Sequence, residues 1–148
     1  MNKGQSLFEV VVALAISALI ITTIVSLVSN SIRNSTFSKN KTLAARYAEE
    51  ATEWLRGERD REITAFRTNI QTSLNSPRCF NSLSWSGIGA CSPGEVIADT
   101  PFTREMTFSI SLIGAKDLIQ ADIVVFWNDS QGYHEVRSAT NFGDWRQR

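Results

Sequence analysis

The feature that most constrains this chain is an uncharged apolar run from Val10 to Val28, near the N-terminus. The run contains neither Pro nor Gly, and its polar side chains are all hydroxyls: Ser17, Thr22, Thr23 and Ser26. As an α-helix it would be about 28 Å long at about 1.5 Å per residue, which is close to the roughly 30 Å of a bilayer's hydrocarbon core. The sequence therefore predicts one helix that can span a membrane.

The segment before this run differs from the start of an ordinary secretory signal. Such a signal has a basic flank, an apolar region of about 7–15 residues and a small-residue cleavage site behind it. Here the apolar run is longer, the carboxylate of Glu9 stands at its leading edge, and residues 28–31 offer only a poor cleavage site. The order of Gly4, a short spacer, Glu9 and then the apolar run resembles the type IV prepilin signature.

The prepilin resemblance implies a processing and assembly pathway. A dedicated prepilin peptidase would cut after Gly4 on the cytoplasmic side, and Gln5 would become the first mature residue and the site of N-methylation. The family's usual first mature residue is Phe, so Gln5 departs from the pattern. Glu9 would pair with the α-amine of Gln5 in a neighbouring subunit, because a carboxylate in an apolar helix is costly unless it is paired. The alternative is that Glu9 lies at the membrane interface and reaches headgroups.

Length and charge set further limits. A chain of 148 residues can hold one domain plus an anchor. Lys+Arg and Asp+Glu both number 15, so the formal net charge is zero and no nucleic-acid partner is predicted. Lys3 lies before the apolar run and Arg33, Lys39 and Lys41 lie after it, so charge alone does not orient the helix. The resemblance implies a bacterial inner-membrane protein, with its N-terminus inside and a periplasmic or extracellular C-terminal domain.

Cys79 and Cys91 are the only cysteines, and the chain has a single histidine, His134. A metal site normally needs more thiols or imidazoles, so no metal and no cofactor is expected. If the domain is exported, the two cysteines would form a disulfide worth about 3 kcal/mol on the chain-entropy model. In a reducing compartment they would instead be free thiols. His134 has no second ligand or nucleophile motif beside it, so no catalytic residue and no enzyme activity are expected.

Apolar residues recur at spacings of three and four from Leu43 to Leu55, which predicts the amphipathic rear of the same long helix. Gly57 is its expected end or kink. The spacing of Ile63, Phe66, Ile70 and Leu74 predicts a second short helix, or a continuation of the first, that ends by Pro77.

The segment Asn75–Pro101 is rich in Ser, Asn, Gly and Pro, and we expect a long irregular loop there, stapled by the cysteines and facing partners. Alternation over Met106–Leu112, an apolar run at Ile119–Trp127, a turn at Asn128–Gly132 and alternation over Tyr133–Thr140 predict an antiparallel meander. Most of the aromatic side chains near these strands should pack the sheet against the helix rather than form an exposed surface: Trp85, Trp127, Tyr133, Phe142 and Trp145.

The expected fold is α+β and pilin-like, with a long N-terminal helix, membrane-spanning in its first half, packed on a small antiparallel sheet of three to four strands. The expected division of the chain is a prepilin leader (1–4), a transmembrane and filament-core helix (5–29), its amphipathic rear (30–57), a connecting region with the disulfide loop (58–101) and the sheet (102–148).

The function expected from the resemblance is that of a minor subunit of a type IV pilus-like filament. Its implied partners are the prepilin peptidase, other pilin or pseudopilin subunits, an inner-membrane assembly platform and membrane lipid. Two alternatives stay open: a minor pseudopilin of a type II secretion or DNA-uptake system, and a signal-anchored periplasmic binding domain that never polymerises.

Overall fold

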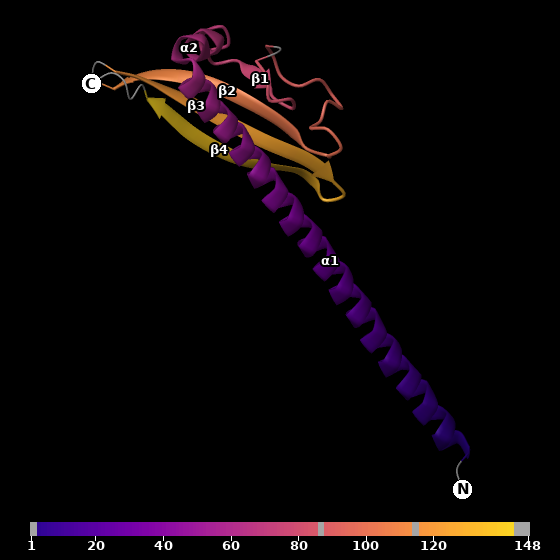
Figure 1. Ribbon diagram of the computed structural model, residues 1–148. Helices are drawn as coiled ribbons and strands as arrows, with labels where there is room; N and C mark the ends of the chain where they lie inside the picture. Colours follow the sequence, from indigo (N-terminus) through magenta and orange to yellow (C-terminus); the bar gives the residue numbers. More distant parts are fainter. Residues whose placement is uncertain (1–2, 86–87, 114–115, 144–148) are drawn as a thin grey trace. The chain divides into compact units, whose positions relative to one another are not determined.

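The computed structural model describes residues 3–85, 88–113 and 116–143, without the side chains of residues 3–6, 112–113 and 116–117. In this described part of the chain, two helices precede four strands (Figure 1). Their bounds are α1 Lys3–Arg61, α2 Ile63–Gln71, β1 Pro77–Cys79, β2 Thr103–Ile113, β3 Lys116–Asp129 and β4 Gly132–Gly143. The chain divides into two compact units, residues 1–40 and residues 41–148.

The rear part of α1, from Lys41 onward, belongs to the second unit and buries a stripe of small residues. Ala44, Ala48 and Ala51 are almost wholly buried, and Leu55 continues the stripe at the same spacing of three to four. Alanine lets a helix approach a sheet closely without loss of helix propensity, so this pattern fixes which face of the helix packs inward. The predicted end at Gly57 is wrong, because the helix continues to Arg61.

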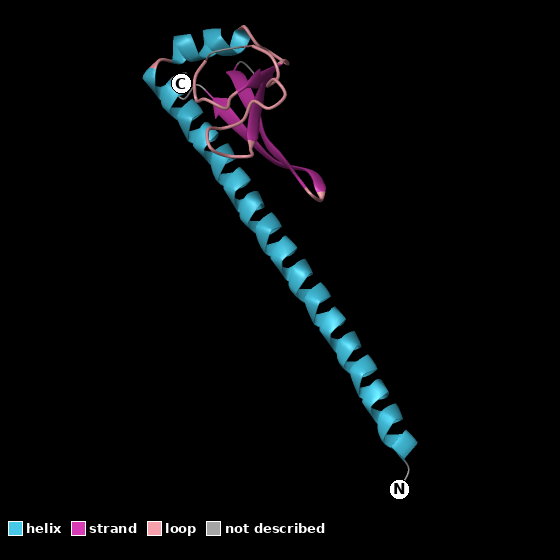
Figure 2. Cartoon of the chain, turned by 90° about the vertical axis from the view of Figure 1, so that its right-hand side faces the viewer, coloured by secondary structure: helices cyan, strands magenta, loops and turns pink. Residues whose placement is uncertain are grey.

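The sheet is fully antiparallel, with its strands in the order β1-β2-β3-β4. Figure 2 shows the strands, in magenta, beside the rear part of α1. Alternate residues are buried in two stretches, from Phe102 to Phe108 at the start of β2 and from Ile119 to Trp127 in β3, whereas Ile110 is 37% exposed. These buried side chains face the rear of α1: Phe102, Arg104, Met106, Phe108, Ile119, Ala121, Ile123, Val125 and Trp127. The opposite face carries residues such as Thr107 and Gln120, which are partly exposed. The predicted α+β fold, a long apolar N-terminal helix and an antiparallel sheet, is confirmed, and the sheet has four strands.

Strand β1 is the element that the sequence did not predict. It lies inside Asn75–Pro101, which was expected to be an irregular loop, and it pairs with β2 through the register Arg78↔Met106. Its three residues carry too little pattern to be recognised, since strand prediction depends on alternation over at least four positions. α2 is separated from α1 at Glu62, so the alternative of a second helix is the correct one.

Aromatic side chains fill the space between helix and sheet, as the sequence predicted for most of them. Trp54 meets Phe80 edge-on with ring centroids 5.5 Å apart, and Phe66 meets Phe142 at 5.7 Å. Trp127 and Phe142 are buried and Trp85 is half-buried, whereas Tyr133 is 57% exposed. Trp145 lies outside the described residues.

Candidate functional site

The N-terminal segment that carries the predicted processing and assembly residues lies in the first turns of α1. Gly4 and Gln5 belong to its helical backbone, and their side chains lie outside the part that the structure describes. Glu9 is exposed, between the exposed side chains of Phe8 and Val10. No described residue pairs with the Glu9 carboxylate, so any counter-charge for it must come from outside the described part of the chain.

The first unit exposes apolar side chains on every side of the helix. From Leu7 to Ile32 its large aliphatic and aromatic residues are between 38% and 70% exposed. A helix that is apolar all round requires a non-aqueous environment, either lipid or other helices. Within the described residues, α1 is the one helix that is long and apolar enough to cross a membrane, and the rest of the chain buries none of its most apolar stretch.

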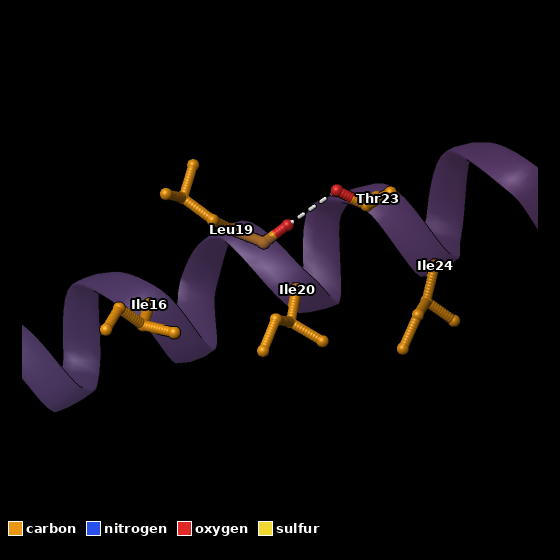
Figure 3. A pocket seen from close by; sticks show the side chains of 5 residues that line it. All are labelled: Ile16, Leu19, Ile20, Thr23 and Ile24. Carbon is orange, nitrogen blue, oxygen red and sulfur yellow. Dashed lines mark hydrogen bonds between the residues drawn. The ribbon is translucent and has the colours of Figure 1, made fainter.

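A shallow groove marks one part of this helix surface (Figure 3). Ile16, Ile20 and Ile24 lie along one side of the helix at spacings of four, and Leu19 and Thr23 form the opposite rim. The Thr23 hydroxyl donates to the Leu19 carbonyl oxygen at 2.8 Å. This bond satisfies the hydroxyl inside its own helix, so Thr23 leaves no polar side-chain group unsatisfied in an apolar environment.

In the second unit, Arg104 joins three separate parts of the chain. The side chain is buried on β2, and its Nη1 donates to the Tyr47 carbonyl oxygen at 2.8 Å and to the Glu50 carboxylate at 2.9 Å, both on the rear of α1. Its Nε donates to the Phe80 carbonyl oxygen at 2.8 Å, in the segment after β1. Arg104 therefore fixes helix, sheet and loop relative to one another.

Burial lowers the pKa of Arg104, and the hydrogen bond and charge of Glu50 oppose this shift. The guanidinium remains charged, since arginine does not lose its proton in proteins. A buried charge is tolerated only when its donors are satisfied, and here helix and loop carbonyls supply most of the acceptors. Sequence reasoning missed this role, although a signal was present: Arg104 precedes Met106 and Phe108 at the same alternate spacing, which places it on the inward face of the strand.

Cys79 and Cys91 form the disulfide expected for an exported chain, with Cα atoms 4.6 Å apart. Asn81 lies beside it and donates to the Glu95 carbonyl oxygen at 2.9 Å, while its own amide oxygen accepts from the Arg104 backbone N–H at 2.8 Å. The two sulfurs and the Glu95 carboxylate lie within 4.8 Å of one another. The sulfurs are bonded to each other, so they are not thiolate ligands while the disulfide is intact.

The single histidine belongs to the β3–β4 hairpin. Its Nε2 lies 3.0 Å from a carboxylate oxygen of Asp129, and its ring packs against Trp127 with centroids 5.2 Å apart. The backbone N–H of Gln131 lowers the pKa of Asp129, and the bond to His134 lowers it further. These contacts close the two ends of the turn on each other, which is a structural role.

Comparison with models of protein families, with curated proteins and with solved structures finds no match for this chain. Its function is therefore inferred from its own residues.

Proposed function

We propose that this protein is a minor subunit of a type IV pilus-like filament, processed by a prepilin peptidase and assembled through its N-terminal helix. The observation that carries the proposal is an apolar helix surface, uncovered by the rest of the chain, whose leading end holds the Glu9 carboxylate without a partner among the described residues. The proposed location is the bacterial inner membrane, with residues 41–148 on the periplasmic or extracellular side, followed by incorporation into the filament.

The pairing of Glu9 with a neighbour's N-terminal amine explains why a carboxylate stands there. Cleavage after Gly4 creates an α-amine at Gln5. Neither charge is favourable alone in a bundle of apolar helices, because desolvation costs several kcal/mol per ion. A stagger that places one subunit's Glu9 beside the next subunit's Gln5 neutralises both, so the pair favours ordered addition of subunits.

Two other functions are distinguishable by observation. A minor pseudopilin of a type II secretion or DNA-uptake system would share the same anchor and differ in its partners, so filaments outside the cell argue for a pilus and their absence for the alternative. A signal-anchored periplasmic binding domain that does not polymerise would keep an intact N-terminus, or be cut near residues 28–31, and would be indifferent to Glu9.

The first experiment is mass spectrometry of the intact protein and its N-terminal peptide from the native host. A mature chain that begins at Gln5 with one added methyl group supports the prepilin pathway. A chain that begins at Met1 or near Asn30 contradicts it.

The second experiment tests Glu9 directly. We expect Glu9→Ala to be cut and inserted normally but to be scarce in isolated filaments, since the amine of its neighbour then lacks a partner. Glu62→Ala, which removes an exposed carboxylate of the second unit, is the matched control. Normal incorporation of Glu9→Ala would refute the assembly role.

A further inference from the structure

The two edge strands of the sheet, β1 and β4, differ in how far other parts of the chain cover them. β1 has three residues, begins with Pro77, and its outer side is covered by the disulfide loop: Cys79 donates its N–H to the Gly89 carbonyl oxygen at 2.8 Å, and Gly89 donates to Pro77 at 3.0 Å. β4 has 12 residues in unbroken register with β3. It contains no Pro and no Lys, and no further described strand pairs with it. β4 therefore lacks the Pro and Lys residues that often protect an edge, and its two charged residues, Glu135 and Arg137, are paired with each other.

The directions of the free backbone groups on β4 follow from the register of the sheet. The carbonyl groups of Arg104 and Phe108 accept hydrogen bonds from the β1 side. Backbone groups of successive strand residues point to opposite sides, so those of the odd-numbered residues of β2, which include Glu105, point to β3. Glu105 pairs with Val124, so the backbone groups of Val124 point to β2 and those of the next residue, Val125, point to β4. Val125 pairs with Val136, so the backbone groups of Val136 point to β3. The backbone groups that face outward on β4 therefore belong to the odd-numbered residues: Tyr133, Glu135, Arg137, Ala139 and Asn141.

A groove of about 400 Å³ runs beside this edge, between β4 and the rear of α1, in the second unit. It is lined by Glu49, Thr52, Glu53, Arg56, Ser138 and Thr140. It stays open because the inward positions of β4 here are hydroxyl residues, too small to reach the helix. A strand added to β4 would direct alternate side chains into this groove, since side chains alternate between the faces of a sheet.

The charge of the groove indicates what kind of side chain it accepts. Glu53 is paired with Arg56, and the neighbouring Glu50 with Arg104. Glu49 is exposed and has no partner among the described residues, so the groove holds one uncompensated carboxylate. A second copy of β4 would not neutralise it, because its inward positions are Gly, His, Val, Ser, Thr and Phe, with no Lys or Arg.

We propose that β4 is a docking edge for an extended segment of a different chain, which adds as a fifth strand and inserts a Lys or Arg side chain beside Glu49. The main-chain bonds to the odd-numbered residues supply affinity, and the groove supplies specificity. On the solvent face Glu135 and Arg137 bind each other at 2.7 Å, so they offer the added strand a neutral surface. This partner class is the same whichever machine the protein serves.

Hydrogen exchange tests the edge while the partner is still unidentified. The full-length protein is compared after purification in detergent and in native membranes or filaments from its host. In the purified protein about half of the β4 amides should exchange slowly, namely those bonded to β3, and in the native assembly the number should rise about twofold. An unchanged number of slow amides overturns the proposal.

Substitutions at one edge position separate strand pairing from simple coverage. Ala139→Pro removes an outward N–H and leaves the β3 bonds intact, so it should abolish the added protection, whereas Ala139→Ser should retain it. Protection that survives Ala139→Pro overturns strand addition. Glu49→Lys should also reduce the added protection of the β4 amides. Asp60→Lys, at an exposed site away from the groove, should leave that protection unchanged. Equal protection in the two variants overturns the claim that the partner places a Lys or Arg beside Glu49.

The identity of the added strand is read by cross-linking. A benzophenone amino acid at position 139 should cross-link, in native membranes, to a peptide of another protein that contains Lys or Arg. A cross-link to a second copy of this chain overturns the proposal that the added strand comes from a different chain. These results are independent of the Glu9 experiment, which can fail while the edge still binds its partner.

Discussion

At the scale of single residues, two charged side chains differ in whether the chain itself supplies their partners. The Arg104 guanidinium is satisfied by acceptors from its own chain, on the rear of α1 and in the segment after β1. The Glu9 carboxylate has no described partner and lies among exposed apolar residues. A charge that is paired inside the chain contributes to folding, and a charge that is left unpaired on an apolar surface requires a partner from elsewhere. Arg104 is therefore a stability residue, and for Glu9 we propose a role in assembly.

Replacement of Arg104 should be among the most damaging changes in the second unit. We expect Arg104→Lys to lower the free energy of unfolding by about 3 kcal/mol, because an ammonium cannot reach the helix and loop acceptors together and leaves buried carbonyl groups without donors. Glu50→Gln should cost less than about 1 kcal/mol, since the Glu50 side chain is 52% exposed. Urea unfolding of the full chain in detergent measures both, and equal losses would contradict the role assigned to the loop carbonyls.

Asp129 should make the hairpin sensitive to acid. The N–H of Gln131, and secondarily His134, lower the pKa of Asp129. A lowered folded-state pKa gives stability that is present above the unfolded value of about 3.9 and is lost as the pH falls through the folded value. Wild type should therefore be more stable than Asp129→Asn at neutral pH, and the difference should shrink below about pH 4. Unfolding curves at several pH values measure it, and a constant difference would refute the linkage.

At the scale of elements, α1 is one continuous helix with two kinds of surface. Residues 10–28 are apolar on every side, whereas the rear buries only the stripe that begins at Ala44. The first part depends on an environment outside the chain, and the second part is stabilised by the sheet. The disulfide loop is the complementary element, because it covers the edge of β1 and supplies acceptors to Arg104.

Gly57 tests the continuity of α1. Beyond its chain neighbours and the backbone of its own helix, a Cβ atom added there meets nothing within 4 Å. Gly57→Ala should therefore raise the free energy of unfolding by about 1 kcal/mol through backbone entropy alone. Thermal unfolding of the full chain measures the change. A destabilised variant would mean that the helix needs a glycine at this position.

Loss of the disulfide should destabilise the second unit by about 3 kcal/mol on the loop-entropy model. The test is the double variant Cys79→Ser with Cys91→Ser, compared with wild type under oxidising and reducing conditions. Reduction of wild type should reproduce the variant, because both release the same loop. A variant that matches oxidised wild type would show that the loop is held by its other contacts alone.

At the scale of the whole molecule, the exposed apolar surface of the first unit predicts association with membranes. A Lys at the centre of a membrane-spanning helix costs about 3 kcal/mol. We expect the double variant Ile20→Lys with Ile24→Lys to appear in the carbonate-soluble fraction, while Ile20→Leu with Ile24→Leu stays in the membrane. Retention of the Lys variant in the membrane would show that the first unit is held by something other than its apolar surface.

The elements with a local pattern were predictable from the amino-acid sequence alone. The apolar run, the amphipathic spacing from Leu43 to Leu55 and the strand alternation around Phe108 all reflect which face of an element is buried, and this periodicity is visible over a few turns or residues. The α+β fold followed from these patterns. The pairing of Cys79 with Cys91 followed from their number, on the condition that the domain is exported.

The features that join distant residues became visible only in the folded chain. Arg104 binds Tyr47 and Glu50, which precede it by more than 50 positions, and β1 was recognisable only through its pairing with β2. The open edge at β4 and the groove beside Glu49 likewise exist because a helix and a strand far apart in sequence lie side by side. Local propensity carries no information about such contacts, since they depend on how the packed faces meet in space.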